Sequence, residues 1–137
     1  MGLIRHRKDE NIFFSWGFYI LNKWLQIKNE GGSLKLYFKD NCLSDVAIYG
    51  GGAIGRRLYE ELCLEKVEVK YFIDQNAKNI HIQGVDVKTL EEKLPKVDAV
   101  IVTPIAFYEI EKNIRSRMGD EVAVISIEDI VDYCFGY

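Results

Sequence analysis

The hydrophobic pattern of the N-terminal part of the chain is helical. Between Asn11 and Glu30 there is no proline and a single glycine, and large apolar residues recur at intervals of three or four positions. Two such series lie side by side and make the apolar face wide: Phe13, Trp16, Ile20, Trp24 and Ile27 form one, and Phe14, Phe18, Leu21 and Leu25 form the other. A Gly-Gly pair ends this helix, and Ser33 is expected to cap a shorter one over residues 34–38. The pattern predicts an aromatic-rich helical hairpin within residues 1–44.

From residue 45 onward, short runs of β-branched residues alternate with amphipathic helical segments. The expected strands are residues 46–49, 67–73, 99–102 and 122–125, with a short extended piece within 82–87. The expected helices are residues 53–64, 107–118 and 127–133, with a brief one near 90–93. Nearly continuous apolar strands separated by helices are typical of a parallel sheet that is covered on both faces. Residues 45–137 are therefore predicted to form a doubly wound α/β domain of four to five strands in the order 2-1-4-5, with the short piece (the third) at the outer edge.

A glycine-rich loop stands between the first expected strand and the helix that follows it. Gly50, Gly52 and Gly55 match G-x-G-x-x-G in this context. In such a loop the first glycine allows a tight turn, the second lets a pyrophosphate approach the backbone, and the third lets the helix lie close to the strand. Free N–H groups at the positive end of the helix can then bind the phosphates. The predicted phosphate-binding loop consists of Gly50, Gly51, Gly52, Ala53, Ile54 and Gly55.

Four further residues belong to the predicted site. Asp74 follows the second strand, where a carboxylate can accept hydrogen bonds from ribose hydroxyls and repel a 2′-phosphate, which favours NAD over NADP. Arg56 follows the last glycine and can bind phosphate, while Thr103 and Pro104 lie at the carboxyl end of another strand, beside the point where ligands collect in such sheets. Each has a structural alternative: a strand-end turn for Asp74, a solvated surface for Arg56, and a strand stop for the Thr-Pro pair.

Residues 45–74, and with them 85–104 and 122–131, resemble the Rossmann-like domains of bacterial polysaccharide-synthesis proteins. These include the N-terminal domains of sugar-nucleotide acetyltransferases and of nucleoside-diphosphate-sugar epimerases or dehydratases, and stand-alone modules. The resemblance implies that the loop from Gly50 to Gly55, together with Asp74, contacts a nucleotide or nucleotide-sugar. Residues 1–137 show neither the hexapeptide β-helix nor the substrate lobe of those enzymes, so no activity is carried over from them.

Two functions are consistent with these observations. The first is a binding module for NAD(P) or a nucleotide-sugar such as a UDP-sugar, accessory or regulatory in capsule or glycan biosynthesis. The alternative is a minimal oxidoreductase or sugar-nucleotide-modifying enzyme that a dimer partner completes. No catalytic residue is assigned, because the Y-x-x-x-K pair Tyr108 and Lys112 comes too early in the fold for the dehydrogenase role of that motif. No metal site is predicted, since the three cysteines and two histidines lack zinc-ligand spacing.

The net charge and the cysteine content limit the partners and the cellular location that we expect for the protein. Eighteen basic and 21 acidic side chains leave a formal charge of −3, which disfavours nucleic acid as a partner. The apolar N-terminal stretch contains Asn22, Lys23 and Gln26 and is too polar to predict a transmembrane segment. Three widely spaced cysteines are expected to be reduced thiols of a cytoplasmic protein. The clustered N-terminal aromatic residues predict a homodimer interface.

Overall fold

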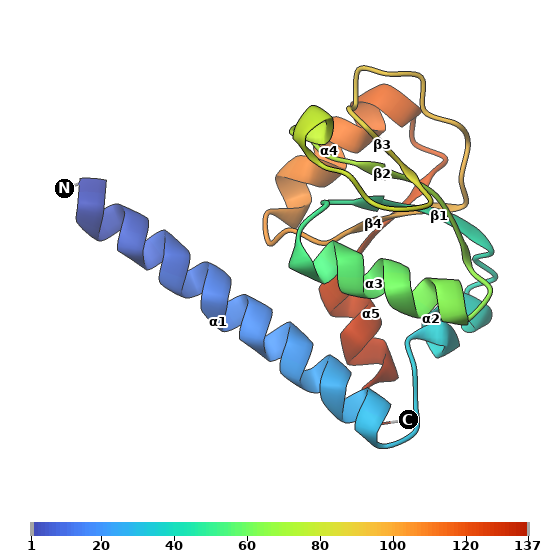
Figure 1. The fold of residues 1–137 in the computed structure, drawn as a ribbon, viewed down its shortest axis with the longest axis horizontal. Coiled ribbons are helices and arrows are strands. Elements are labelled where there is room, and N and C mark those ends of the chain that lie inside the picture. Colours follow the sequence, from blue (N-terminus) through green and yellow to red (C-terminus); the bar gives the residue numbers. More distant parts are fainter. Residues whose placement is uncertain (1, 137) are drawn as a thin grey trace.

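The computed structural model describes residues 2–136, and their side chains from residue 10 onward. Five strands form one sheet in the order β3-β2-β1-β4-β5, and every neighbouring pair is parallel (Figure 1). They are β1 (Asp45–Tyr49), β2 (Glu68–Ile73), β3 (Asp86–Lys88), β4 (Ala99–Val102) and β5 (Ala123–Ser126). The expected parallel α/β sheet is confirmed, including the short strand at its outer edge. This arrangement is consistent with a Rossmann-like fold.

Helices cover both faces of the sheet. They are α1 (Gly2–Asn29), α2 (Lys35–Asp40), α3 (Ala53–Leu64), α4 (Phe107–Met118) and α5 (Ile127–Cys134), with a short 3₁₀ helix η1 (Ala77–Asn79). Successive side chains of a strand point to opposite faces. Val46 and Ile48 of β1 therefore join a core cluster with α1, α2, α3 and α5, whereas Ala47 and Tyr49 join a second cluster with α4.

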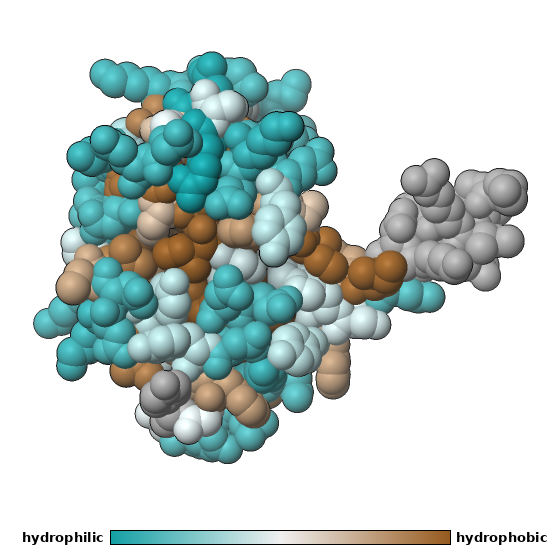
Figure 2. Space-filling model, turned by 180° about the vertical axis from the view of Figure 1, so that it is seen from behind, coloured by the Kyte–Doolittle hydropathy of each residue, from teal (hydrophilic) through white to brown (hydrophobic). Residues whose placement is uncertain are grey.

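The N-terminal helices share the core of the sheet domain. Ile20, Trp24 and Ile27 of α1 are buried in the same cluster as residues of β1, α3 and α5. Three polar contacts join α1 to α5: Trp16 Nε1 donates to Glu128 Oε1 at 2.6 Å, and both the Tyr19 hydroxyl and Lys23 Nζ donate to Asp132 Oδ1, at 3.1 and 2.7 Å. The other end of α1 extends away from the body of the molecule (Figure 1). Seen from behind, hydrophobic residues continue from the body along the helix that leaves it at the right (Figure 2).

Three local predictions need correction. The helix expected from Asn11 already begins at Gly2. Ser33 lies one residue before the N-cap position of α2, which Leu34 occupies, although its Oγ still accepts a hydrogen bond from the backbone N–H of Lys35. The prediction of a brief helix near residues 90–93 was wrong, because the chain forms only a turn there. Tertiary packing overrides the helical propensity of this segment, since Leu90 and Leu94 both pack against the core cluster that includes residues of α4.

No helix within the described residues combines the length and apolar character needed to cross a bilayer. The sequence of α1 contains Asn22, Lys23 and Gln26, and Ile20, Trp24 and Ile27 of this helix are buried in the core.

Candidate functional site

The turn from β1 into α3 requires glycine at two of its three motif positions. Gly50 has a φ of +107°, and a Cβ there would overlap the side chain of Thr103. A Cβ on Gly55 would overlap the carbonyl oxygen of Gly50, since the first turn of α3 lies directly on the end of β1. The loop is held by the N–H of Gly50, which donates to the carbonyl oxygen of Ile73 at 2.8 Å. These two glycines therefore have the structural roles that the motif assigns to them.

Gly52 is different, because nothing lies within 4 Å of the place where its Cβ would stand. It is the N-cap residue of α3, and no side chain caps this helix end within the described part of the chain. The carbonyl oxygen of Gly52 accepts the first helical hydrogen bond, from the N–H of Arg56 at 3.0 Å. The backbone N–H groups of the first turn lack intrahelical partners, as at any helix start. The open space at Gly52 leaves room for an anion to reach them.

Asp74 ties the end of β2 to the glycine loop. Its Oδ2 accepts a hydrogen bond from the N–H of Gly51 at 2.8 Å, and its Oδ1 accepts one from the N–H of Asn76 at 2.9 Å. The strand-end turn that sequence reasoning left open as an alternative is thus present. A carboxylate offers about four acceptor positions, so both oxygens can still accept from a ligand hydroxyl.

The other predicted residues lie beside the loop and also support it. Thr103 is buried, and its Oγ1 donates to the carbonyl oxygen of Tyr49 at 2.8 Å. Pro104 packs against Gly50, close to where a Cβ of that glycine would stand. The Arg56 side chain turns back, and its Nε donates to the carbonyl oxygen of Gly51 at 3.1 Å. The Arg56 guanidinium is therefore hydrogen-bonded to the loop.

A cavity of about 620 Å³ lies between the glycine loop and α1. One wall contains the predicted site, and the other contains apolar residues of α1. The loop side is formed by Gly50, Gly52, Ala53, Ile54, Gly55, Asp74, Thr103 and Pro104; the helix side is formed by Phe13, Phe14, Gly17, Phe18 and Leu21. Sequence reasoning missed the second wall. The signal available was the second apolar series of α1, which leaves more hydrophobic surface than one sheet can bury.

On the other side of the loop, a smaller cavity of about 320 Å³ lies next to Tyr49, Asp74 and the start of α4. Burial, followed by the negative charge of Asp74, raises the pKa of the Tyr49 hydroxyl above its ordinary value. Tyr49 is therefore a neutral hydroxyl near neutral pH and can donate a hydrogen bond. A ligand held at the glycine loop would have polar surface on this side and apolar surface on the other.

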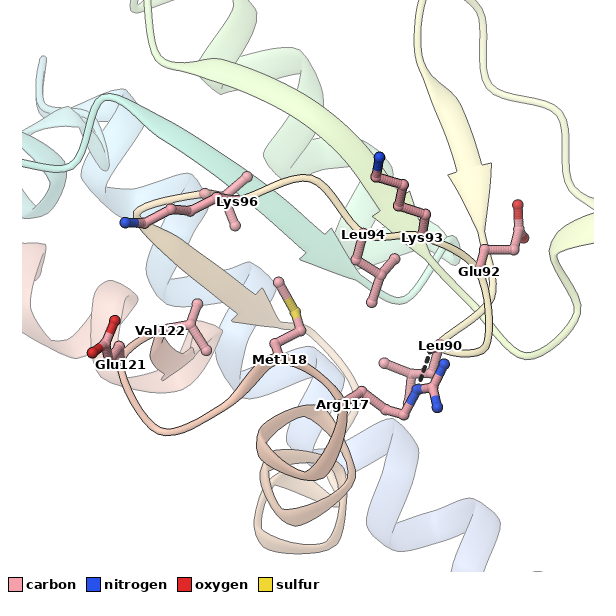
Figure 3. A pocket seen from close by; sticks show the side chains of 10 residues that line it. Leu90, Glu92, Lys93, Leu94, Lys96, Arg117, Met118, Glu121 and Val122 are labelled. Carbon is pink, nitrogen blue, oxygen red and sulfur yellow. Dashed lines mark hydrogen bonds between the residues drawn. The ribbon is translucent and has the colours of Figure 1, made fainter.

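A further cavity of about 600 Å³ lies away from the loop, between the end of α4 and the segment 90–97 (Figure 3). Leu94 and Met118 project into it from its two walls, and charged side chains of both signs surround it (Figure 3). Arg117 closes one side, with its Nε donating to the carbonyl oxygen of Leu90 at 2.8 Å and its Nη2 to that of Glu91 at 3.1 Å. Because the charges are mixed and the guanidinium is already paired, this cavity indicates no ligand class.

The residues excluded from catalysis lie outside these cavities. Tyr108 is 83% exposed on α4 and lines none of the cavities described above. Within the described residues, no three His, Cys, Asp or Glu side chains are grouped closely enough to hold a metal ion.

No protein-family profile, curated protein or solved structure matches this chain. The site must therefore be interpreted from its own chemistry.

Proposed function

We propose that this chain is a Rossmann-like nucleotide-binding module that holds the diphosphate of NAD, or of a nucleotide-sugar such as a UDP-sugar, at Gly50–Gly55. One observation carries the proposal. At the uncapped start of α3 the space in front of Gly52 is open, whereas Gly50 and Gly55 are sterically required for the turn that creates this space. A diphosphate suits such a site because helix N-termini bind anions through free N–H groups and the helix dipole.

The proposed role is that of an accessory or regulatory subunit in bacterial capsule or glycan biosynthesis, acting in the cytoplasm. The resemblance of residues 45–74 to domains of polysaccharide-synthesis proteins supports the pathway. The position of Tyr108, exposed and outside the cavities, supports a module over a self-sufficient oxidoreductase. Asp74, placed at the loop, supports NAD over NADP because its charge disfavours a 2′-phosphate.

Ligand binding tests the proposal through Gly52 and Asp74. Titration calorimetry with NAD, NADP, UDP and UDP-sugars is expected to find at least one ligand for the wild-type protein. Gly52→Val should abolish its binding because the side chain enters the open space, while Gly52→Ala, the matched control, should keep the fold and weaken binding less. Asp74→Asn keeps an acceptor for Gly51 N–H but loses the charge, and should weaken binding by about 1–3 kcal/mol. Unchanged affinity in both Gly52→Val and Asp74→Asn would place the ligand elsewhere.

We further propose that α1 takes part in a homodimer. Leu25 of α1 and Leu64 of α3 are strongly exposed, at 60% and 80%, and flank a groove of about 290 Å³ between these helices. Exposed apolar groups of this kind mark contact surfaces, and two-fold pairing is the commonest oligomeric state.

Sedimentation velocity tests the dimer. The wild-type protein is expected to sediment as a dimer at tens of micromolar, and Leu64→Glu as a monomer, because a carboxylate would have to be desolvated in the interface. Tyr108→Glu, an equally exposed position outside the groove, is the control and should remain dimeric. A monomeric wild-type protein would contradict the proposal.

A further inference from the structure

We propose that the base of the bound nucleotide stacks against α1, on Phe14 and Phe18, and that Gly17 makes the room for it. The inference rests on the proposed function, because it takes the diphosphate to lie at the glycine loop. It adds that α1 forms part of the ligand site and that the ligand is recognised by its aromatic ring system. A sugar phosphate without a base would bind poorly.

The cavity leads from the diphosphate position directly to the aromatic wall. Its volume of about 620 Å³ lies within the range of small-molecule sites, roughly 300–1,000 Å³. Beyond Gly52 the cavity is lined almost entirely by apolar groups. Of the two polar side chains in the lining, Thr103 already donates its hydroxyl proton to the carbonyl oxygen of Tyr49, and Asp74 lies at the loop end. The hydroxyl groups of a second sugar would lack partners there and would be costly to desolvate. A planar base has two π-faces and needs few hydrogen bonds, so it fits this lining.

The two phenylalanines are accessible to such a ring. Phe14 is 67% exposed and Phe18 is 72% exposed, although both line the cavity. They lie one helical turn apart, on the same side of α1. Their rings remain in contact with water in the unliganded protein, and a stacked base would cover them. The exposed leucines that support the dimer, Leu25 and Leu64, line a different groove.

Gly17 is the least expected residue of this wall. A glycine inside a helix is unfavourable relative to alanine. Gly17 is itself buried, between the exposed Phe14 and Phe18, yet nothing stands within 4 Å of the place where its Cβ would be. No neighbouring backbone or side chain therefore requires a glycine here. The missing side chain instead enlarges the cavity opposite the glycine loop.

Binding of ADP, UDP and inorganic pyrophosphate to the full-length protein separates the contribution of the base from that of the phosphates. Phe18→Ala should weaken the nucleotides about 5- to 100-fold, the scale on which loss of one stacking partner is felt, and leave pyrophosphate unchanged. Gly17→Leu should fill the cavity and abolish nucleotide binding while pyrophosphate still binds. Tyr108→Ala, which removes an exposed ring outside the cavity, is the control and should bind nucleotides like the wild type.

Two kinds of failure are distinguishable. Nucleotides that bind the wild type, are lost in Gly52→Val and are unaffected by Phe18→Ala and Gly17→Leu would overturn the role of α1 and leave the proposed function standing. A wild-type protein that binds no nucleotide would overturn both. If Phe18→Ala changes the sedimentation coefficient and leaves the nucleotide affinity unchanged, the aromatic wall is covered by a second copy of the chain and the stacking proposal is wrong.

Discussion

Replacing Glu61 by alanine is expected to lower the free energy of unfolding by about 3 kcal/mol, a large share of the 5–15 kcal/mol typical of a domain. The Glu61 side chain is only 5% exposed, and its carboxylate accepts from Trp24 Nε1 at 3.0 Å and from the N–H of Leu34 at 2.6 Å. Lys28 Nζ lies 3.2 Å from the same carboxylate. Without the carboxylate, two buried donors have no partner, and each costs about 1–3 kcal/mol.

The adjacent glutamate provides the control for this prediction. Glu60 is exposed and pairs with Arg57 on the surface of α3 at 2.7 Å, so Glu60→Ala should change the stability by less than about 1 kcal/mol. Glu61→Gln, which keeps one acceptor oxygen, should fall between the two. Urea denaturation monitored by circular dichroism measures all three. A Glu61→Ala protein as stable as Glu60→Ala would show that the hydrogen bonds of Glu61 contribute little to holding α1 and α2.

The second large effect is expected at Gly55. Gly55→Ala should destabilise the protein by about 3 kcal/mol, the upper part of the usual range for overpacking, because the new Cβ overlaps a backbone carbonyl oxygen that cannot rotate away. The matched change Gly52→Ala places the same methyl group in open space and should leave stability within about 0.5 kcal/mol. Thermal and chemical denaturation give both values. Equal stabilities would mean that the start of α3 shifts freely away from β1, and the turn would then not define the proposed phosphate site.

These two residues lie on the same helix and join the two walls of the site. The N-terminal turn of α3 contains Gly55 and faces the cavity, while Glu61, farther along α3, receives the hydrogen bond of Trp24 from α1. The position of α1 relative to the loop therefore depends on a contact outside the cavity. On the proposed function, loss of Glu61 is expected to reduce nucleotide affinity as well as stability, since one of the contacts that hold the aromatic wall opposite Gly52 would be lost.

Much of the sheet domain could be predicted from local patterns. The β-branched runs at 46–49 and 99–102 match β1 and β4 closely, and the piece near residues 82–87 was placed at the outer edge, where β3 lies. Serine is a favoured N-cap residue, and Ser126, directly before the last expected helix, accepts a hydrogen bond from the N–H of Glu128. These features depend on neighbouring residues and on the period of the hydrophobic pattern, both of which are visible in the sequence.

The residues of the loop could also be named in advance, because a G-x-G-x-x-G motif after a strand has a defined geometry. The roles of the polar residues beside the loop could not. Asp74 and Arg56 both bond to the loop itself, through Gly51, and Thr103 bonds to the end of β1. Whether a polar side chain turns toward the protein or toward a ligand depends on which backbone groups other elements leave unpaired nearby, and this is a property of the folded chain.

By itself, then, the sequence determined the parallel α/β sheet, the glycine turn and an N-terminal helix with more apolar surface than usual, since each follows from residues close together in the chain. The tertiary structure decided which parts of the protein the apolar surface of this helix contacts. Glu61, an ordinary helical glutamate in the sequence, becomes buried because Trp24 and Leu34 converge on it from other elements. That contact helps to hold α1 opposite the glycine loop, where Phe13, Phe14 and Phe18 line one wall of the cavity. Contacts between residues far apart in the chain have no periodic signature, so only the folded structure reveals them.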